Sequence, residues 1–241
     1  MHALLLHGWG IENSIWKEAQ SLFSVFESLS SPNLYQLARD TEDSSFASIA
    51  SKLLNSIDKE TVIVAWSIGG LMAIPLQKLS NKVKAIIFIA STPCFVNKAA
   101  WSNVLDEKNI CELKTSLGNS AEKTLEYFSG LIAHGDVKAK QTNKIIRQHL
   151  TDETNKKILS SWLDQMIATD YRKDFCEITC PILALLAEND SLINLNLEKE
   201  LISLNNNIDT KIINDSCHAP FISKHEETTK IIKEFINAKF S

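Results

Sequence analysis

A short stretch around Ser67 constrains the fold of this chain more than any other feature. Thr61–Val64 precede it and are β-branched and apolar, which is typical of a buried strand. The run Ala65-Trp66-Ser67-Ile68-Gly69-Gly70 follows, and Leu71–Ile74 are typical of the start of a helix. A serine between a strand and a helix, with small residues two positions away on either side, indicates a sharp turn. Such a turn presents the hydroxyl as a nucleophile.

Apolar runs and amphipathic stretches alternate along most of the chain, as in a parallel sheet covered by helices. Helices are expected at Phe46–Ile57 and Glu226–Phe235, among others. From about residue 95 to 175 the alternation stops, and polar helical segments replace strands. We therefore predict an α/β fold with one domain over residues 1–241, a mostly parallel sheet and a helical insertion. The expected strands are Ala3–His7, Asn33–Leu37, Thr61–Ala65, Val83–Ala90, Ile182–Ala187 and Thr210–Ile213.

Two segments of the insertion have apolar faces at helical spacing. Such faces are usually core, but an insertion between strands can also cap an active site and turn its apolar face toward the substrate. The two faces consist of Leu125, Phe128, Leu131 and Ile132, and of Ile158, Leu159, Trp162, Leu163, Met166 and Ile167.

Composition excludes several classes of protein. The formal net charge of -4 is not that of a nucleic-acid-binding protein. No apolar run approaches the roughly 20 residues that span a bilayer, and Met1–His7 is too short and uncharged for a signal peptide. The odd count of five cysteines, without a C-x-x-C pair, favours reduced thiols and argues against a metal site. We expect a cytoplasmic protein without membrane or nucleic-acid partners.

A serine nucleophile needs a base, and the base needs an acid that orients it. In α/β-hydrolases these groups follow in the order Ser, Asp or Glu, His. Asp190 follows the predicted strand Ile182–Ala187, and the carboxyl end of a parallel strand is where active sites form. A turn-forming role is the alternative for Asp190, and Glu188 and Asp215 are weaker candidates for the acid.

His218 is the candidate base, because among six histidines it alone lies in a loop after the last predicted strand. His7 is expected to brace the loop that follows the first strand. His225 is expected to be solvated and His149 to be a surface residue, and His134 is a weaker candidate for contact with substrate.

Negative charge on the carbonyl oxygen of an acyl-transfer intermediate is stabilised by two backbone N–H groups. Ile68, the residue after the nucleophile, would supply one. Trp9 would supply the other, because it lies in the loop after the first strand with a glycine on each side. This chemistry requires no metal and no organic cofactor.

Four motifs resemble the biotin-pathway esterases that demethylate pimeloyl-[acyl-carrier protein] methyl ester. The resemblance covers nearly the whole chain and implies the α/β-hydrolase fold with a cap insertion at about residues 95–175. It also implies a triad of Ser67, Asp190 and His218. The motifs are His7-Gly8-Trp9-Gly10, Trp66-Ser67-Ile68-Gly69-Gly70, Ser91-Thr92-Pro93-Cys94-Phe95 and His218-Ala219-Pro220-Phe221-Ile222-Ser223.

The resemblance also implies substrate contacts in the insertion. Tyr127–Ile132 resembles the acyl-chain contact segment of these esterases, which points to Phe128, Ser129, Gly130, Leu131 and Ile132. In the family, cap arginines bind the acidic acyl carrier protein, and the alternative for the equivalent cations here is a solvated helical face. Those cations are Lys123, Lys138, Lys140, Lys144 and Arg147.

The resulting prediction is a serine carboxylesterase that releases methanol from pimeloyl-[acyl-carrier protein] methyl ester. A broad esterase for small esters, or an acyl thioesterase, would use the same three residues. A non-catalytic ligand-binding protein with this fold is the alternative from another class, and such proteins often lose one of the three.

Overall fold

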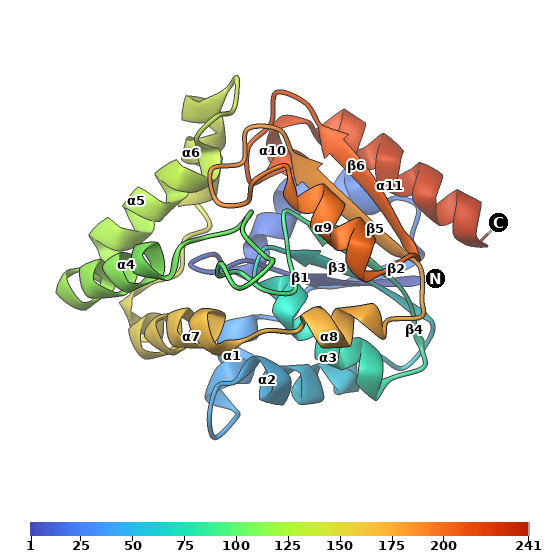
Figure 1. Cartoon of the computed structure of the whole chain (residues 1–241), viewed down its shortest axis with the longest axis horizontal. Helices are drawn as coiled ribbons and strands as arrows, with labels where there is room; N and C mark the ends of the chain where they lie inside the picture. The colour runs from blue at the N-terminus through green and yellow to red at the C-terminus, as the bar shows by residue number, and fades with distance from the viewer. Residues whose placement is uncertain (241) are drawn as a thin grey trace.

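Six parallel strands form one sheet in the order β2-β1-β3-β4-β5-β6 (Figure 1). The computed structural model describes residues 1–240. The strands are β1 (His2–Leu6), β2 (Ser28–Ser30), β3 (Thr61–Trp66), β4 (Val83–Ile89), β5 (Ile182–Ala187) and β6 (Ile208–Ile213).

Helices cover both faces of this sheet. The 3-10 helix η1 and helices α10 and α11 pack together on one face, while α1, α2, α3 and α8 lie on the other (Figure 1). On these faces lie η1 (Asn13–Phe23), α1 (Leu34–Arg39), α2 (Phe46–Leu53), η2 (Leu54–Ser56), α3 (Gly69–Leu79), α8 (Arg172–Cys176), α9 (Leu197–Leu204), α10 (Pro220–Ser223) and α11 (His225–Phe240).

Burial on both faces explains why the central strands are continuous apolar runs. Every residue of β3 and β5 is buried. In the register of the sheet, Val64 lies between Leu5 of β1 and Ile87 of β4. Parallel strands covered by helices on both sides have this composition. The predicted α/β fold with a parallel sheet is confirmed.

The connection from β4 to β5 holds four further helices that lie beyond the carboxyl ends of the strands (Figure 1). We call them the cap helices. That residues 1–241 form one domain, with a cap insertion at about residues 95–175, stays a prediction. The cap helices are α4 (Glu107–Asn119), α5 (Ala121–Ala133), α6 (Ala139–Arg147) and α7 (Lys156–Ala168), with the 3-10 turn η3 (Glu153–Asn155) before α7.

The predicted strand Asn33–Leu37 is wrong, because this segment forms helix α1. The Asn33 side chain accepts a hydrogen bond from the Gln36 N–H at 3.1 Å and so caps the helix. The strand is instead the short β2, whose Ser28 and Ser30 hydroxyls hydrogen-bond to the two ring nitrogens of His2 at 2.9 and 2.8 Å. A polar strand of three residues leaves no periodic signal in the sequence.

Within residues 1–240, no helix combines the length and the apolar character that crossing a membrane requires.

Candidate active site

Ser67 stands on a strained turn between β3 and α3. Its φ of 54° lies in the left-handed region, which non-glycine residues adopt rarely and mostly at functional sites. The Ser67 N–H donates to the Ile89 carbonyl at 3.0 Å, and the Ser67 carbonyl accepts from the Ser91 hydroxyl at 2.6 Å. The turn is therefore held by β4 and the loop that follows it.

The two glycines after Ile68 are required by close packing at the start of α3. A Cβ on Gly69 would lie 2.7 Å from the Leu6 carbonyl oxygen, and one on Gly70 would lie 2.1 Å from Ser91 Oγ. Both distances are shorter than real Cβ contacts. The small residue two positions after Ser67 is thus explained by the approach of α3 to β1.

His218 and Asp190 form a buried pair at the carboxyl ends of β6 and β5. The His218 Nδ1–H donates to Asp190 Oδ2 at 2.8 Å, and the two side chains are 1% and 2% exposed. The other carboxylate oxygen accepts from the backbone N–H groups of Leu192 and Ile193 at 2.8 and 3.2 Å. Since a carboxylate only accepts, Nδ1 carries a proton, and in the neutral imidazole Nε2 is then the acceptor.

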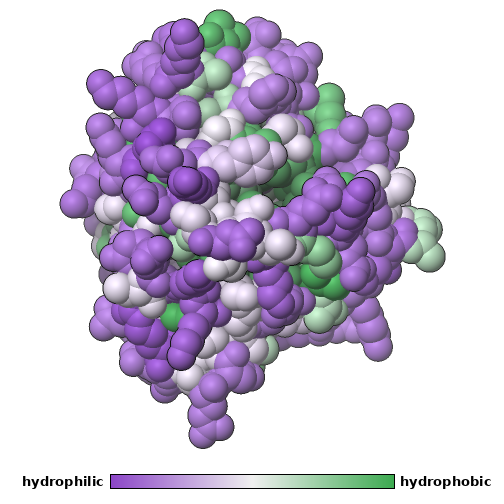
Figure 2. Space-filling model, turned by 90° about the vertical axis from the view of Figure 1, so that its left-hand side faces the viewer, coloured by the Kyte–Doolittle hydropathy of each residue, from purple (hydrophilic) through white to green (hydrophobic). Residues whose placement is uncertain are grey.

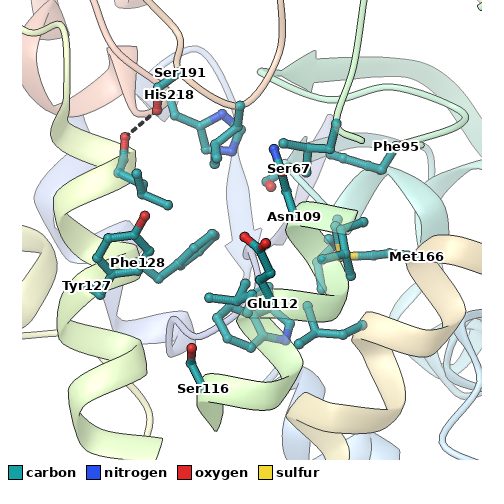
Figure 3. A pocket seen from close by; sticks show the side chains of 18 residues that line it. Ser67, Phe95, Asn109, Glu112, Ser116, Tyr127, Phe128, Met166, Ser191 and His218 are labelled. Atoms are coloured by element: carbon teal, nitrogen blue, oxygen red, sulfur yellow. Dashed lines mark hydrogen bonds between the residues drawn. The ribbon is translucent and has the colours of Figure 1, made fainter. Parts of the chain in front are cut away.

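The Nε2 atom of His218 is buried and has no hydrogen-bond partner in the described part of the chain. His218 and Ser67 both line the same cavity (Figure 3). The loop that carries His218 is fixed by Trp66, whose indole N–H donates to the His218 carbonyl at 2.8 Å. An imidazole with a free acceptor beside a hydroxyl is what general-base activation of a serine requires.

Two weaker candidates for the acid lie away from this pair. Glu188 and Asp215 are exposed, and the Glu188 carboxylate accepts from the Asp215 N–H at 2.9 Å. That contact joins the loops after β5 and β6, so it fits a structural role.

Trp9 and Ile68 bring two unpaired backbone N–H groups to the cavity. Both residues line it, and among residues 1–240 neither N–H donates to another backbone group. The Trp9 indole N–H donates to the Leu159 carbonyl of α7 at 3.0 Å, which anchors the loop. Free N–H groups beside a nucleophile can stabilise an oxyanion.

His7 braces the same loop from below. Its ring accepts from the Leu34 N–H at 3.1 Å and donates to the Gly8 carbonyl at 3.0 Å. Burial lowers the pKa of His7 to about 4, so the ring is neutral and can serve as both acceptor and donor.

The cavity has a volume of about 410 Å³ and lies between the turn at Ser67 and the cap helices (Figure 3). Its walls are mainly apolar, with Phe95 from the loop after β4 and Leu163 and Met166 from α7. On the face that carries the cap helices, apolar residues are recessed among hydrophilic ones (Figure 2). The size and lining suit a small molecule with an apolar body.

The predicted acyl-contact segment lies on α5, and only part of it faces the cavity. Phe128 and Leu131 line the cavity, together with Tyr127. Phe128 packs edge-on against Trp9, with ring centroids 4.8 Å apart. The other three predicted residues do not line the cavity, because they lie on other faces of the helix. They are Ser129, Gly130 and Ile132.

Helix α4 also lines the cavity, which the sequence motifs do not predict. Asn109, Glu112 and Ser116 line the cavity from this helix. Their spacing of three and four residues places them on one helical face, which was the available signal. These three polar side chains by themselves predict a face exposed to solvent and not a cavity wall.

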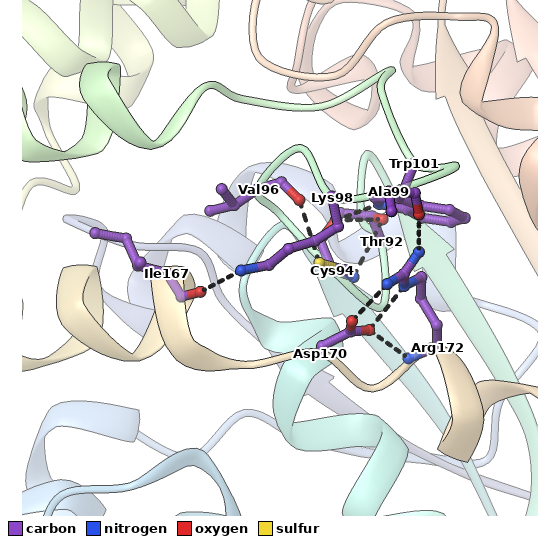
Figure 4. Close-up of polar contacts among 9 residues, drawn as sticks. All are labelled: Thr92, Cys94, Val96, Lys98, Ala99, Trp101, Ile167, Asp170 and Arg172. Carbon is purple, nitrogen blue, oxygen red and sulfur yellow. Dashed lines mark hydrogen bonds and ion pairs between the residues drawn. The ribbon is translucent and has the colours of Figure 1, made fainter.

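The motif residues Ser91–Phe95 belong to a loop that is tethered to the chain after α7 (Figure 4). The Pro93 carbonyl accepts from the Tyr171 N–H at 3.0 Å. The Cys94 carbonyl accepts from the Trp101 indole N–H at 2.9 Å. These contacts hold Phe95 in the cavity wall.

An ion pair supports this loop from below. The Arg172 guanidinium binds both carboxylate oxygens of Asp170, at 2.9 and 2.7 Å, and donates to the Ala99 carbonyl at 3.1 Å (Figure 4). Hydrogen bonds from Arg172 hold the pKa of Asp170 below its usual value. The guanidinium also lies 5.7 Å from the ring centroid of Trp101.

The predicted docking cations are exposed, on α5, on α6 and just before α6. Lys140, Lys144 and Arg147 border one shallow hollow along α6. Arg147 also pairs with Glu126 of α5. The other two, Lys123 and Lys138, are exposed but do not border this hollow.

Two expectations about histidines are resolved by the packing. The expectation that His149 is a surface residue is wrong, because it is buried and hydrogen-bonded to Ser14 at 2.8 Å and to Glu18 at 3.1 Å. It ties the end of α6 to η1. His134 is exposed and does not line the cavity.

Curated relatives match the chain over nearly its full length. One, from Photobacterium profundum, is 28% identical over 238 residues, which cover 97% of this chain and 93% of the relative. Another, from Vibrio vulnificus, is 27% identical over 228 residues, 92% of this chain and 89% of the relative. Both are named pimeloyl-[acyl-carrier protein] methyl ester esterase, which confirms the resemblance stated from the motifs. No family model matches the sequence.

Solved structures share the fold. An esterase from Exiguobacterium antarcticum superposes with a TM-score of 0.80 at 13% identity. The superposition covers 98% of this chain and 92% of the esterase chain. A bromoperoxidase from Bacillus anthracis superposes with a TM-score of 0.81 at 16% identity, with 98% and 91% covered. At these identities the likeness establishes the fold alone, which is that of the α/β-hydrolases.

Proposed function

We propose that this chain is a serine carboxylesterase that hydrolyses the methyl ester of pimeloyl-[acyl-carrier protein] and releases methanol. One observation carries the proposal: the buried Asp190–His218 pair leaves Nε2 free in the same cavity as Ser67 on its strained turn. The names of the full-length relatives supply the substrate.

Acylation begins when Ser67 attacks the ester carbonyl while His218 Nε2 takes the hydroxyl proton. Asp190 keeps the imidazole in the tautomer that can accept it and stabilises the imidazolium. The oxyanion accepts hydrogen bonds from the N–H groups of Trp9 and Ile68. His218 then gives its proton to the departing methoxy group, and methanol leaves.

Deacylation repeats these steps with water as the nucleophile. His218 takes a proton from water, hydroxide attacks the acyl-enzyme, and the same two N–H groups hold the oxyanion. Ser67 regains its proton from His218, and the free carboxylic acid leaves on the carrier. Phe128 and Leu131 contact the acyl chain in this proposal, whereas Ser129, Gly130 and Ile132 lie on the same helix outside the cavity lining.

The acyl carrier protein docks on α6 in this proposal. Lys140 and Lys144 supply positive charge on the cap of a chain whose net charge is -4. An acidic partner needs such a local patch, because the overall field repels it. Lys123 of α5, Lys138 just before α6 and Arg147 of α6 supply further positive charge in this proposal. We assign the reaction to the cytoplasm.

The test is mass spectrometry of methyl pimeloyl-carrier protein after incubation with the wild-type enzyme and with Ser67→Ala. We expect the wild type to remove the methyl group and leave the thioester to the carrier intact. The variant should be slower by about 10³-fold or more, because the nucleophile is gone. Near-native turnover by Ser67→Ala would refute the assignment of Ser67.

The other outcomes separate the rival functions. Loss of the whole acyl chain from the carrier would make the protein a thioesterase. Cleavage of small esters only would make it a broad carboxylesterase, as several structural neighbours are named esterases. Failure of a fluorophosphonate to label Ser67 would favour a non-catalytic binding protein.

A further inference from the structure

The side chains that line the cavity carry negative but no positive permanent charge. Of the 18 residues that line it, Glu112 alone has a permanently charged side chain, and none is lysine or arginine. The remaining polar groups are hydroxyl and amide side chains, the Trp9 indole and the His218 imidazole. An anionic group on a ligand would therefore find no cation among the lining residues.

Glu112 projects from α4 into the opening of the cavity. In Figure 3 its carboxylate points into the space between Phe128 of α5 and Met166 of α7. Its side chain is 66% exposed, so it stands at the mouth and keeps contact with solvent. Asn109 and Ser116 flank it on the same helical face, and both are neutral.

The nearest cation to Glu112 does not face the cavity. Lys108 Nζ lies 3.7 Å from Glu112 Oε1, is 83% exposed and is not a lining residue. An exposed pair of this kind is weak and screened by salt. The charge that a ligand meets at the mouth is therefore the carboxylate.

We propose that Glu112 is a specificity-determining residue that rejects esters whose far end is a free carboxylate. The enzyme then selects acyl chains whose far end is uncharged, as in a thioester or a second ester. This rests on the proposed function only in taking a methyl ester as the bond that is cleaved. Free monoesters of dicarboxylic acids are thereby kept from competing with chains attached to a carrier.

The size of the effect follows from Coulomb's law. Two like charges about 4 Å apart in water disfavour binding by roughly five-fold, and by more where the wall excludes water. Added salt weakens the repulsion, because the charges at the mouth are exposed to solvent. The dependence on the distance between the charges and the dependence on salt distinguish electrostatic repulsion from a poor steric fit.

The experiment compares dimethyl pimelate with monomethyl pimelate, whose far ends carry a neutral methyl ester and a carboxylate. Values of kcat/KM are compared per ester group, because the diester has two. We expect the wild type to have the higher kcat/KM for the diester. Glu112→Gln should raise kcat/KM for the monoester about five-fold relative to the diester, and Glu112→Lys should raise it further. Monoesters of shorter and longer dicarboxylic acids show at which chain length the carboxylate meets Glu112.

Glu107→Gln is the matched control, because it removes the same charge from the same helix outside the cavity. We expect its diester-to-monoester ratio to match that of the wild type. The proposal is overturned if Glu112→Gln leaves this ratio unchanged at every chain length, or if Glu107→Gln shifts it equally.

A second readout keeps this inference separate from the proposed function. Alkyl p-nitrophenyl phosphonates with a methyl ester or a carboxylate at the far end modify the serine and release p-nitrophenolate without any ester turnover. Faster inactivation by the neutral probe, lost in Glu112→Gln, would support the role of Glu112 even if methyl esters were not cleaved. The role of Glu112 would be refuted if the two probes inactivated the wild type at equal rates, or if the ratio of their rates were the same in Glu112→Gln.

Discussion

Burial of the His7 ring couples one side chain to the stability of the whole protein. Burial lowers its pKa from 6.5 to about 4, since the protonated ring would lose its hydration. Between these values the unfolded chain binds a proton that the folded chain does not. The contribution of His7 is therefore fully present above pH 6.5 and is lost as the pH falls toward 4.

We expect the free energy of unfolding to drop by about 3 kcal/mol between about pH 7.5 and pH 4 through His7 alone. Urea titrations of the wild type and of His7→Asn at both pH values measure this, and the drop should be smaller in the variant by about that amount. His134→Asn, which changes an exposed histidine, is the control and should follow the wild type. Parallel pH dependences of the wild type and His7→Asn would contradict the prediction.

At the scale of elements, the end of α5 is joined to the loop that carries Asp190. The Ser191 hydroxyl donates to the Leu131 carbonyl at 2.7 Å, and the Asn189 side-chain amide donates to the Gly135 carbonyl at 3.1 Å. Gly135 has a φ of 86°, and a Cβ there would lie 2.3 Å from the Asn189 carbonyl oxygen. The cap therefore supports the acid loop by direct backbone contact.

Gly135→Ala should lower kcat on dimethyl pimelate by about ten- to a hundred-fold, because the added methyl group displaces the acid loop. It should also destabilise the fold by roughly 1–2 kcal/mol through the left-handed backbone. Gly118→Ala in α4 is the matched change, since a Cβ there meets nothing within 4 Å. Wild-type kcat in Gly135→Ala would show that the acid loop is independent of the cap.

At the scale of the whole molecule, net charge and local charge have opposite signs. The chain carries a net charge of -4, yet Lys140, Lys144 and Arg147 lie together along α6. Lys140 and Lys144 form no ion pair within residues 1–240, whereas Arg147 pairs with Glu126. Of these three cations, the two lysines are therefore the better able to attract an acidic partner.

The double variant Lys140→Glu/Lys144→Glu should lower kcat/KM for methyl pimeloyl-carrier protein by about ten-fold relative to dimethyl pimelate, which is the internal reference. Added salt should shrink the difference. Lys230→Glu/Lys233→Glu reverses the same number of charges on α11, away from the cap, and should keep the wild-type ratio (Figure 1). If both double variants lowered the ratio of kcat/KM values equally, the effect would come from net charge, and docking on α6 would be contradicted.

The serine turn and the order of the three site residues could be predicted because each depends on local sequence. Val62–Val64 are β-branched and apolar, which favours a buried strand, and Gly69 permits the turn that follows Ser67. Asp190 lies in the loop after the apolar strand β5, and His218 lies in the loop after β6. Parallel strands align their carboxyl ends, so these residues had to meet at one edge of the sheet.

The packing between distant segments was decided by the tertiary structure alone. Whether Asn33 begins a strand or caps a helix depends on the space beside β1, and His149 is buried only because η1 covers it. Periodicity places Phe128 on an apolar face but does not say which neighbour that face meets. The position of Glu112 at the cavity mouth likewise depends on how α4 packs against α5 and α7. A polar helical face has the same sequence pattern whether it borders solvent or a substrate, so the sequence alone does not distinguish the two.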